Sequence, residues 1–284
     1  MRRRFFKSFA ICIALCVSSA EALDVREGSA DAVWTEEHIG EPLDLTGYDL
    51  IFSDEFDKDR ISPDGGRGPW FAPIHYPWGV AKLEPPDGRT YSVHDGILTI
   101  RASKDFRDIW HSGSIQTVDS KGQGFAQQYG YFEARMKFPA MPGAWPAFWL
   151  KSQRDAWEKT LTRTEIDIVE WYGGDPVGHH RTVHLWPADR PRPGDITKQW
   201  WKGDYSKIPD LPRVWHDYGA LITPDWVIVY LDRKELARIK SLSEFRTPLY
   251  PLVSLELYEK DAPLATSPVD LAVDYVRVYA PEYQ

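Results

Sequence analysis

Cysteine and asparagine are the most informative absences in this chain of 284 residues. Its only two cysteines, Cys12 and Cys16, lie near the start, and no asparagine occurs anywhere in the sequence. The rest of the chain therefore has no disulfide framework, no thiol nucleophile and no cysteine-bound zinc site. The absence of asparagine also excludes N-linked glycosylation.

The first segment has the pattern of a secretion signal. Met1–Ala22 begins with basic residues, continues with an apolar run from Phe9 to Val17 and ends in the small-residue pattern Ala20-Glu21-Ala22. The apolar run is too short to span a bilayer. We therefore expect a signal peptide over residues 1–22 and one domain over residues 23–284. The mature protein is expected to be secreted or periplasmic, without membrane contact after cleavage.

Basic residues are fewer than acidic ones, 34 against 42, which gives a formal net charge of −8. Loss of the basic signal segment makes the mature chain more acidic still. This charge offers no electrostatic attraction to nucleic acid or anionic lipid. It also disfavours strongly acidic polysaccharides, unless a local basic patch compensates. We expect no nucleic-acid partner, and we expect a monomer.

Aromatic residues are abundant, with 13 Trp, 14 Tyr and 12 Phe. Tryptophan is rarely left exposed, so this many indole rings require a large core, a cleft, or both. Core packing accounts for about half of them by the usual burial of this residue type.

Strand-like alternation dominates the chain after residue 23, and no helical period of useful length occurs. Asp95-Gly96 is a strong signal for a two-residue hairpin. Strands at this spacing predict an all-β fold, either a two-sheet β-sandwich or a jelly roll. The expected strands are Tyr48–Phe56, Thr90–His94, Ile97–Ala102, Gly113–Val118, Tyr129–Phe138, Trp145–Lys151, Thr164–Tyr172, Arg181–Trp186, Trp215–Ile222, Trp226–Leu231, Glu235–Lys240, Tyr250–Leu257 and Leu271–Tyr279.

Two stretches lack a strand pattern. Asp57–Arg89 is rich in glycine and proline, and Pro187–Pro212 carries Trp200, Trp201 and Tyr205. Long loops within a compact domain are usually functional. We therefore expect both stretches to be loops that contribute to function.

The segment from Thr164 to Trp171 carries three acids. Glu165 and Asp167 alternate with isoleucines, so a strand would place both carboxylates on one face. Glu170 has the opposite parity, and a single β-bulge would bring it to the same face. An exposed polar strand face is the ordinary explanation for such a pattern.

Two features favour a functional site instead. The three acids have no basic partner within the segment, and a second strand places Trp145 and Trp149 on one face. Indole rings stack on sugar rings, and glycosidic cleavage requires two carboxyl groups that flank one bond. The sequence therefore predicts a carbohydrate-active site.

These residues resemble the E-x-D-x-x-E signature of glycoside hydrolase family 16, in the bulged form of its laminarinase-like members. The resemblance extends over most of the chain, roughly from Tyr48 to Tyr279. The further matching motifs are Ile51–Phe56, Ser112–Thr117, Tyr129–Arg135, Trp145–Leu150, Val183–Trp186, Trp215–Tyr218, Thr223–Asp225 and Asp274–Tyr279.

The resemblance implies a curved jelly roll with an open cleft on its concave face, and cleavage of internal β-linkages with retention of configuration. It implies that Glu165 is the nucleophile, Asp167 its hydrogen-bonding helper and Glu170 the general acid/base. We expect a raised pKa for Glu170 because two other carboxylates lie close to it. The chemistry requires no cofactor.

The resemblance also indicates candidate ligands of sugar and metal. Each tryptophan among the expected sugar contacts has core packing as its alternative role. The resemblance implies a candidate site for a structural calcium ion, because oxygen ligands suit a hard cation. The expected sugar contacts are Trp145, Trp149, Trp171, His184 and Trp186, and the possible calcium ligands are Glu55, the Gly96 carbonyl and Asp274.

Departures from the family pattern leave the substrate open. The family often has asparagine in its cleft; Gln116, Gln123, Gln127, Arg107 or Glu256 are the candidates to replace it. The substrate could be a β-1,3- or β-1,3-1,4-glucan or a bacterial exopolysaccharide. Two alternatives remain: a non-catalytic carbohydrate-binding module, and a transglycosylase that uses the same covalent intermediate.

Overall fold

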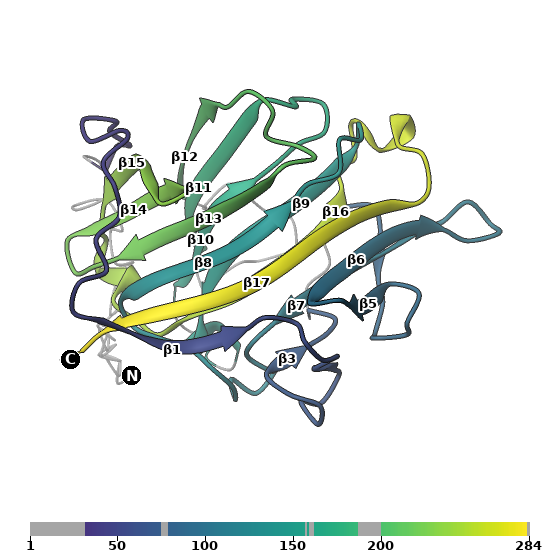
Figure 1. Cartoon of the computed structure of the whole chain (residues 1–284), viewed down its shortest axis with the longest axis horizontal. Coiled ribbons are helices and arrows are strands. Elements are labelled where there is room, and N and C mark those ends of the chain that lie inside the picture. The colour runs from purple at the N-terminus through teal and green to yellow at the C-terminus, as the bar shows by residue number, and fades with distance from the viewer. Residues whose placement is uncertain (1–31, 75–78, 157, 159–161, 187–199, 283–284) are drawn as a thin grey trace, which may run out of the picture. The chain divides into compact units, whose positions relative to one another are not determined.

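In the computed structural model the regular secondary structure is almost entirely β-strand, as the sequence predicts (Figure 1). It describes residues 32–74, 79–156, 158, 162–186 and 200–282, so the expected signal peptide lies outside the described residues. Within these ranges the helical elements are the short 3-10 turns η1 (Gln153–Ala156), η2 (Ser243–Phe245) and η3 (Ala262–Leu264). None of them is long or apolar enough to pass through a bilayer.

The strands form two layers, here called sheet 1 and sheet 2. In sheet 1 the order is β15-β14-β13-β8-β17, and β17 is flanked on its other side by β1 and by the β6–β5 hairpin. Their bounds are β1 (Tyr48–Asp54), β5 (Tyr91–His94), β6 (Ile97–Lys104), β8 (Gly130–Lys137), β13 (Trp215–Ile222), β14 (Trp226–Leu231), β15 (Lys234–Lys240) and β17 (Val269–Pro281).

Sheet 2 has the order β12-β11-β10-β9-β16-β7-β3-β2. Strand β4 (Lys82–Leu83) pairs with β7, and β6 also pairs with β7, which joins the two sheets at one edge. The bounds are β2 (Ile61–Ser62), β3 (Trp70–Phe71), β7 (Trp110–Gln116), β9 (Ala144–Ser152), β10 (Arg163–Glu170), β11 (Gly178–Trp186), β12 (Trp200–Lys207) and β16 (Leu249–Leu257).

Local sequence signals fix much of this arrangement. Asp95 and Gly96 both adopt positive φ, 50° and 74°, and close the β5–β6 hairpin as expected. On β8, Phe132, Ala134 and Met136 are fully buried, as their shared parity predicts. The two sheets therefore enclose an apolar core, and the predicted jelly-roll class is confirmed.

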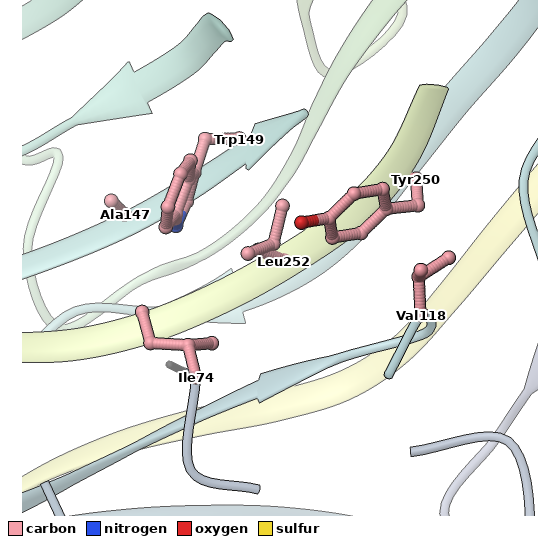
Figure 2. Packing of buried hydrophobic residues seen from close by; sticks show 6 residues of the cluster. All are labelled: Ile74, Val118, Ala147, Trp149, Tyr250 and Leu252. Atoms are coloured by element: carbon pink, nitrogen blue, oxygen red, sulfur yellow. The ribbon is translucent and has the colours of Figure 1, made fainter. Parts of the chain in front are cut away.

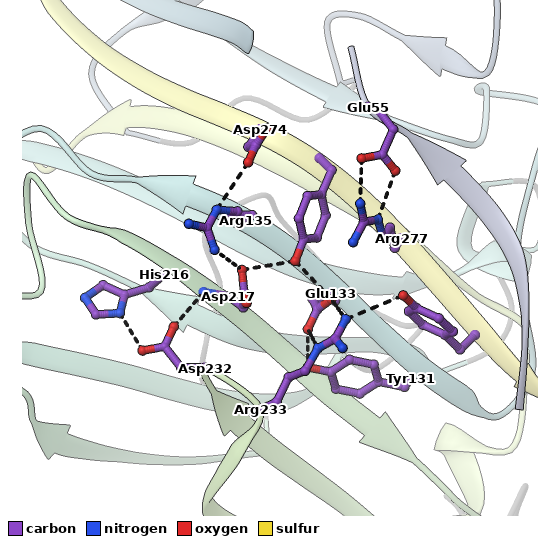
Figure 3. Close-up of polar contacts among 12 residues, drawn as sticks. Glu55, Tyr131, Glu133, Arg135, His216, Asp217, Asp232, Arg233, Asp274 and Arg277 are labelled. Atoms are coloured by element: carbon purple, nitrogen blue, oxygen red, sulfur yellow. Dashed lines mark hydrogen bonds and ion pairs between the residues drawn. The ribbon is translucent and has the colours of Figure 1, made fainter. Parts of the chain in front are cut away.

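The outer face of sheet 1 carries a network of charged and phenolic side chains (Figure 3). At its centre, the fully buried Glu133 accepts two hydrogen bonds from Arg233, at 2.9 and 2.8 Å, and one from Tyr131 at 2.9 Å. Tyr275 lies between Glu133 and Asp217, and its hydroxyl donates to Asp217 at 3.0 Å. Buried carboxylates need such partners, so these polar groups serve the structure of this face.

Two of the three candidate calcium ligands, Glu55 and Asp274, lie in this network, and their carboxylates are already paired (Figure 3). Arg277 donates to both carboxylate oxygens of Glu55, at 2.9 and 2.7 Å, and Arg135 lies 3.2 Å from Oδ2 of Asp274. A Cβ on Gly96 would lie 3.7 Å from the Glu55 carbonyl oxygen. Because a guanidinium occupies the Glu55 carboxylate, this side chain does not fit the expected calcium site. Carbonyl oxygens and the second Asp274 oxygen would remain as donors.

The described part of the Asp57–Arg89 stretch, residues 57–74 and 79–89, is not a structureless loop, since it contains the short strands β2, β3 and β4. It packs against part of sheet 2: Ile74 belongs to a buried cluster with Trp149 and Leu252, to which Tyr250 also belongs (Figure 2). The face of β9 and β16 at these positions is therefore covered. On β10 and β11, by contrast, Glu165 and His184 keep 17% and 16% of their side-chain surface exposed.

Glu256 of β16 is covered as well, and its burial has a consequence for stability. The side chain is fully buried, and burial raises the pKa of its carboxyl to about 8 from a normal value of 4.5. The folded protein therefore retains a proton that the unfolded chain releases above its ordinary pKa, so stability falls as the pH rises from about 5 to 8. We expect Glu256→Gln to raise the free energy of unfolding by about 1–3 kcal/mol at pH 8 and to change it little at pH 5.

Urea denaturation of both proteins at the two pH values measures this difference. Glu259→Gln, an exposed residue of the same segment, is the matched control and should show no such pH dependence. An equal effect of Glu256→Gln at both pH values would contradict a buried, protonated carboxyl.

Candidate active site

The three carboxylates of β10 lie on one face of sheet 2 because a β-bulge interrupts the strand. Between Asp167 and Glu170, β10 advances by three residues while its partner β11 advances by two. The register with β9 shifts at the same place. Ile168 and Val169 within the bulge are both fully buried, which leaves Glu165 and Glu170 on the same side. The predicted bulge is confirmed.

Glu165 lies between two nitrogen donors. Lys151 is its register partner on β9, and the lysine Nζ lies 3.5 Å from Oε2 of Glu165. On the other side, Nε2 of His184 lies 3.9 Å from Oε1. The Glu165 side chain keeps 17% of its surface exposed. The carboxylate is thus held in a fixed position and is still accessible from the open side of the sheet.

Asp167 is buried and paired with His184, whose Nε2 lies 3.0 Å from its Oδ2. Burial and the charge of Glu165 raise the pKa of Asp167. Burial opposes a charge on His184, but Asp167, Glu165 and Glu170 together outweigh that effect and raise the histidine pKa. The hydrogen bond between the two residues therefore fixes the orientation of both side chains.

Within the described part of the chain, the same group brings three ligand-type side chains close enough together to hold a metal ion. Ligand atoms of Glu165, Asp167 and His184 lie within 4.8 Å of one another. Two carboxylates and an imidazole suit a divalent transition metal. An ion bound there would occupy the accessible carboxylate of Glu165 and would compete with any chemistry at this group.

Glu170 receives two hydrogen bonds on a single oxygen. Nε1 of Trp145 and the hydroxyl of Tyr172 both donate to Oε1, each at 3.0 Å. This leaves Oε2 to carry the proton when the carboxyl is neutral. Burial, followed by the charge of Asp167, raises the pKa of Glu170, and the two donors only partly offset this. The expected raised pKa agrees with this environment.

Tyr172 should set the upper pH limit of any reaction that needs protonated Glu170. Its hydroxyl favours the ionised carboxylate and so lowers the pKa of Glu170. We expect Tyr172→Phe to move the alkaline limb of the kcat/KM profile upward by about 0.5–1 pH unit. The matched control is Tyr258→Phe, which removes a hydroxyl from the ring that packs edge-on against Tyr172. The same shift in both variants would indicate a general change in packing and would contradict the assignment.

Two of the expected sugar-contact tryptophans lie half-buried beside the acids. Trp145 stacks on Tyr172 with a centroid distance of 5.5 Å and an interplanar angle of 28°. Trp186 stacks on His184 at 5.2 Å and 13°. Both positions are compatible with a sugar contact, and so is the position of His184.

The other two tryptophans are core residues, which corrects the expectation for them. Trp171 is fully buried and donates from Nε1 to the carbonyl of Pro176 at 3.1 Å. Trp149 is only 3% exposed and donates to Ser254 at 3.2 Å. Neither ring offers an open face, because segments distant in sequence pack over them. Both therefore leave the set of sugar contacts.

The sequence interpretation missed Lys151 and Tyr172. Lys151 has the same strand parity as Trp145 and follows it by six residues, so its place on the acidic face could have been read from the alternation. Tyr172 follows Glu170 by two residues, which is the same kind of signal. Parity places both residues on the acidic face, but only their contacts with Glu165 and Glu170 in the structure show that they belong to the site.

Comparison with known sequences identifies relatives. The sequence model described as "Glycosyl hydrolases family 16" matches residues 87–260. The endo-1,3-1,4-beta-glycanase EglC of Rhizobium meliloti is 30% identical over 94% of this chain and 59% of its own length. The endo-1,3-1,4-beta-glycanase ExsH of the same organism is 28% identical over 84% of this chain and 53% of its own length. The chain thus spans little more than half the length of these relatives.

Comparison with solved structures supports the fold. SCLam, described as a non-specific endo-beta-1,3(4)-glucanase of family GH16, superposes with a TM-score of 0.68 at 23% identity. The match covers 89% of this chain and 98% of SCLam. At this identity the likeness establishes the jelly-roll architecture.

Proposed function

Because this chain belongs to family 16 of the glycosyl hydrolases, we propose that it is a retaining endo-β-glucanase that cleaves internal bonds of a β-1,3- or β-1,3-1,4-linked glucan. The observation that carries the proposal is the bulge of strand β10, which brings the side chains of Glu165, Asp167 and Glu170 to one face of the sheet. The substrate class is supported by the names of the Rhizobium relatives. A non-catalytic sugar-binding module has no need for these three acids together.

In the proposed first step, Glu165 attacks the anomeric carbon of the sugar at the cleavage point. The glycosidic bond breaks, and its electron pair goes to the leaving oxygen, which takes the proton from Oε2 of Glu170. The products are a glycosyl ester of Glu165 and a shortened chain with a free hydroxyl. Lys151 holds the attacking carboxylate in position, at 3.5 Å from its Oε2.

In the second step, Glu170 is the ionised base and takes a proton from water. The water oxygen attacks the same anomeric carbon from the opposite face, and the ester bond to Glu165 breaks. Two inversions give net retention of configuration. Asp167 and His184 remain paired beside Glu165 and keep its orientation through both steps. The two-carboxyl mechanism needs no cofactor.

We also propose that the protein is secreted, on the basis of the Met1–Ala22 sequence pattern. Its activity is then expected on polysaccharide outside the cytoplasm. Detection of the protein in periplasmic and culture fractions, with its new N-terminus sequenced, tests this part independently of the enzymology.

A panel of polysaccharides tests the proposed activity. We expect the purified protein to shorten a β-1,3-glucan or a mixed-linkage β-1,3-1,4-glucan, with chain length falling faster than reducing ends appear. NMR of the earliest products should show the β-anomer first. A purely β-1,4-linked cellulose derivative is the control for linkage.

Each other outcome points to a specific alternative. Binding without cleavage across the panel would indicate a carbohydrate-binding module. Products longer than the starting oligosaccharide would indicate a transglycosylase. Cleavage of a native bacterial exopolysaccharide alone would keep the mechanism and replace the substrate.

A further inference from the structure

Strand β12 carries aromatic side chains on one face, and the proposed roles of the three acids do not explain them. Its residues alternate between half-buried and exposed, and the exposed set is Trp201, Gly203, Tyr205 and Lys207. Trp201 is 58% exposed and Tyr205 48%. A single exposed ring is ordinary, but two rings on one face of an edge strand are a candidate contact surface.

The register places this face in line with the acids. Across β11, His184 is the partner of both Glu165 and Trp201, and His180 is the partner of both Glu170 and Tyr205. Directly opposed residues of antiparallel strands point to the same side of the sheet. Trp201 therefore extends the row that contains Glu165, and Tyr205 extends the row that contains Glu170.

Between these two rows runs a third row of smaller side chains. It passes from Asp167 through Thr182 to Gly203. The strands are about 4.8 Å apart, so Gly203 lies about 10 Å from Asp167. Trp201 and Tyr205 thus lie on either side of Gly203. This group is separated from the acids by the length of one or two sugar residues.

Gly203 has a steric role in this arrangement. A Cβ at this position would lie 3.1 Å from Cζ3 of Trp201 and 3.3 Å from Oγ1 of Thr182. The indole therefore leans over the glycine, and a larger residue would displace it. The ring of Tyr205 stacks on that of His180, with the ring centroids 5.5 Å apart and an interplanar angle of 21°.

The opposite side of the acids offers less open surface. Trp149 and Leu252, which continue the sheet through β9 and β16, are buried in the cluster with Ile74 (Figure 2). The accessible continuation of the site is thus towards β12. We propose that Trp201, Gly203 and Tyr205 form a sugar-binding platform that holds residues of the β-glucan chain beyond the cleavage point. This inference rests on the proposed function.

Substrate length provides the test. We expect Trp201→Ala in the full chain to lower kcat/KM on polymer and long oligosaccharides by roughly tenfold. On the shortest oligosaccharide that is cleaved, kcat/KM should stay within about twofold of wild type, because that substrate does not reach β12. Phe106→Ala, which removes another highly exposed ring outside sheet 2, is the matched control.

A second variant protects the test against misfolding. Gly203→Val keeps both aromatic side chains but fills the space between them with a larger side chain. A β-branched residue is well tolerated in a strand. It should reduce activity on long substrates selectively, as Trp201→Ala does. An equal loss of kcat/KM on short and long substrates, or no loss in either variant, would overturn the proposed sugar-binding platform.

A binding experiment separates this inference from the proposed activity. Affinity electrophoresis in gels that contain β-1,3-glucan or mixed-linkage glucan measures retardation without any cleavage. Wild type that is retarded but inactive would refute the proposed function, while loss of retardation in Trp201→Ala would still support the platform. A change of oligomeric state in Trp201→Ala, with retardation unchanged, would assign this face to contact between copies and overturn the proposal.

Discussion

Replacement of Glu165 by alanine is expected to lower kcat on β-glucan by roughly 10⁴-fold or more, since removal of a nucleophile eliminates the covalent route. The fold should be unaffected, because the side chain is partly exposed and its main contacts are Lys151 at 3.5 Å and His184 at 3.9 Å. Initial rates and the melting temperature measure the two effects. Glu259→Ala, on the surface, is the matched control.

A small anion provides the sharper form of this test. In Glu165→Ala, azide should enter the space left by the carboxylate and attack an activated aryl glycoside. The product would then be the α-glycosyl azide, because only one inversion occurs. Recovery of a β-configured product, or residual activity within a hundredfold of wild type on natural glucan, would contradict the assignment of Glu165 as the nucleophile.

Replacement of Glu170 by glutamine should have an effect that depends on the leaving group. On natural glucan the loss is expected to be roughly 10²–10⁴-fold, the usual contribution of a general acid. A dinitrophenyl glycoside leaves without a proton, so the first step should retain most of its rate. The second step still lacks its base, and the covalent intermediate should accumulate as a burst of released phenol.

The pH profile gives a second readout for Glu170. Burial and the Asp167 charge raise the pKa of its carboxyl, so the protonated form persists through neutral pH. Wild-type kcat/KM on natural glucan should therefore fall only as the pH rises past this raised pKa, well above the normal range of a glutamate. In Glu170→Gln the alkaline limb should be lost. An alkaline limb that survives unchanged in the variant would assign it to another group.

Strand β10 shows which structural features can be predicted from the local sequence pattern. The alternation around Glu165 and Asp167, together with the parity of Glu170, predicts a bulge, and the register contains one at that place. Parity along a strand is a property of the chain itself, so it survives into any sheet that the strand joins. The hairpin at Asp95-Gly96 is confirmed for the same reason, since positive φ at both residues is a local preference.

Strand β12 shows where local pattern fails. The stretch from Pro187 to Pro212 is expected to be a loop; residues 187–199 lie outside the described residues, but Trp200–Lys207 pairs with β11 along its whole length. Glycine and lysine are weak strand formers, and the segment contains both. The available edge of β11 decides its structure, and that edge is formed by residues that precede it in the chain.

The sequence by itself determined the all-β class, the acidic face of β10 and its bulge, because alternation and turn preference act between neighbouring residues. Only the tertiary structure decided which tryptophans face outward, that Arg277 occupies the Glu55 carboxylate, and that Trp145 and Tyr172 donate to Glu170. Burial and pairing depend on segments that meet from distant parts of the chain. The local sequence pattern does not predict which distant segment will pack against a given face of a sheet.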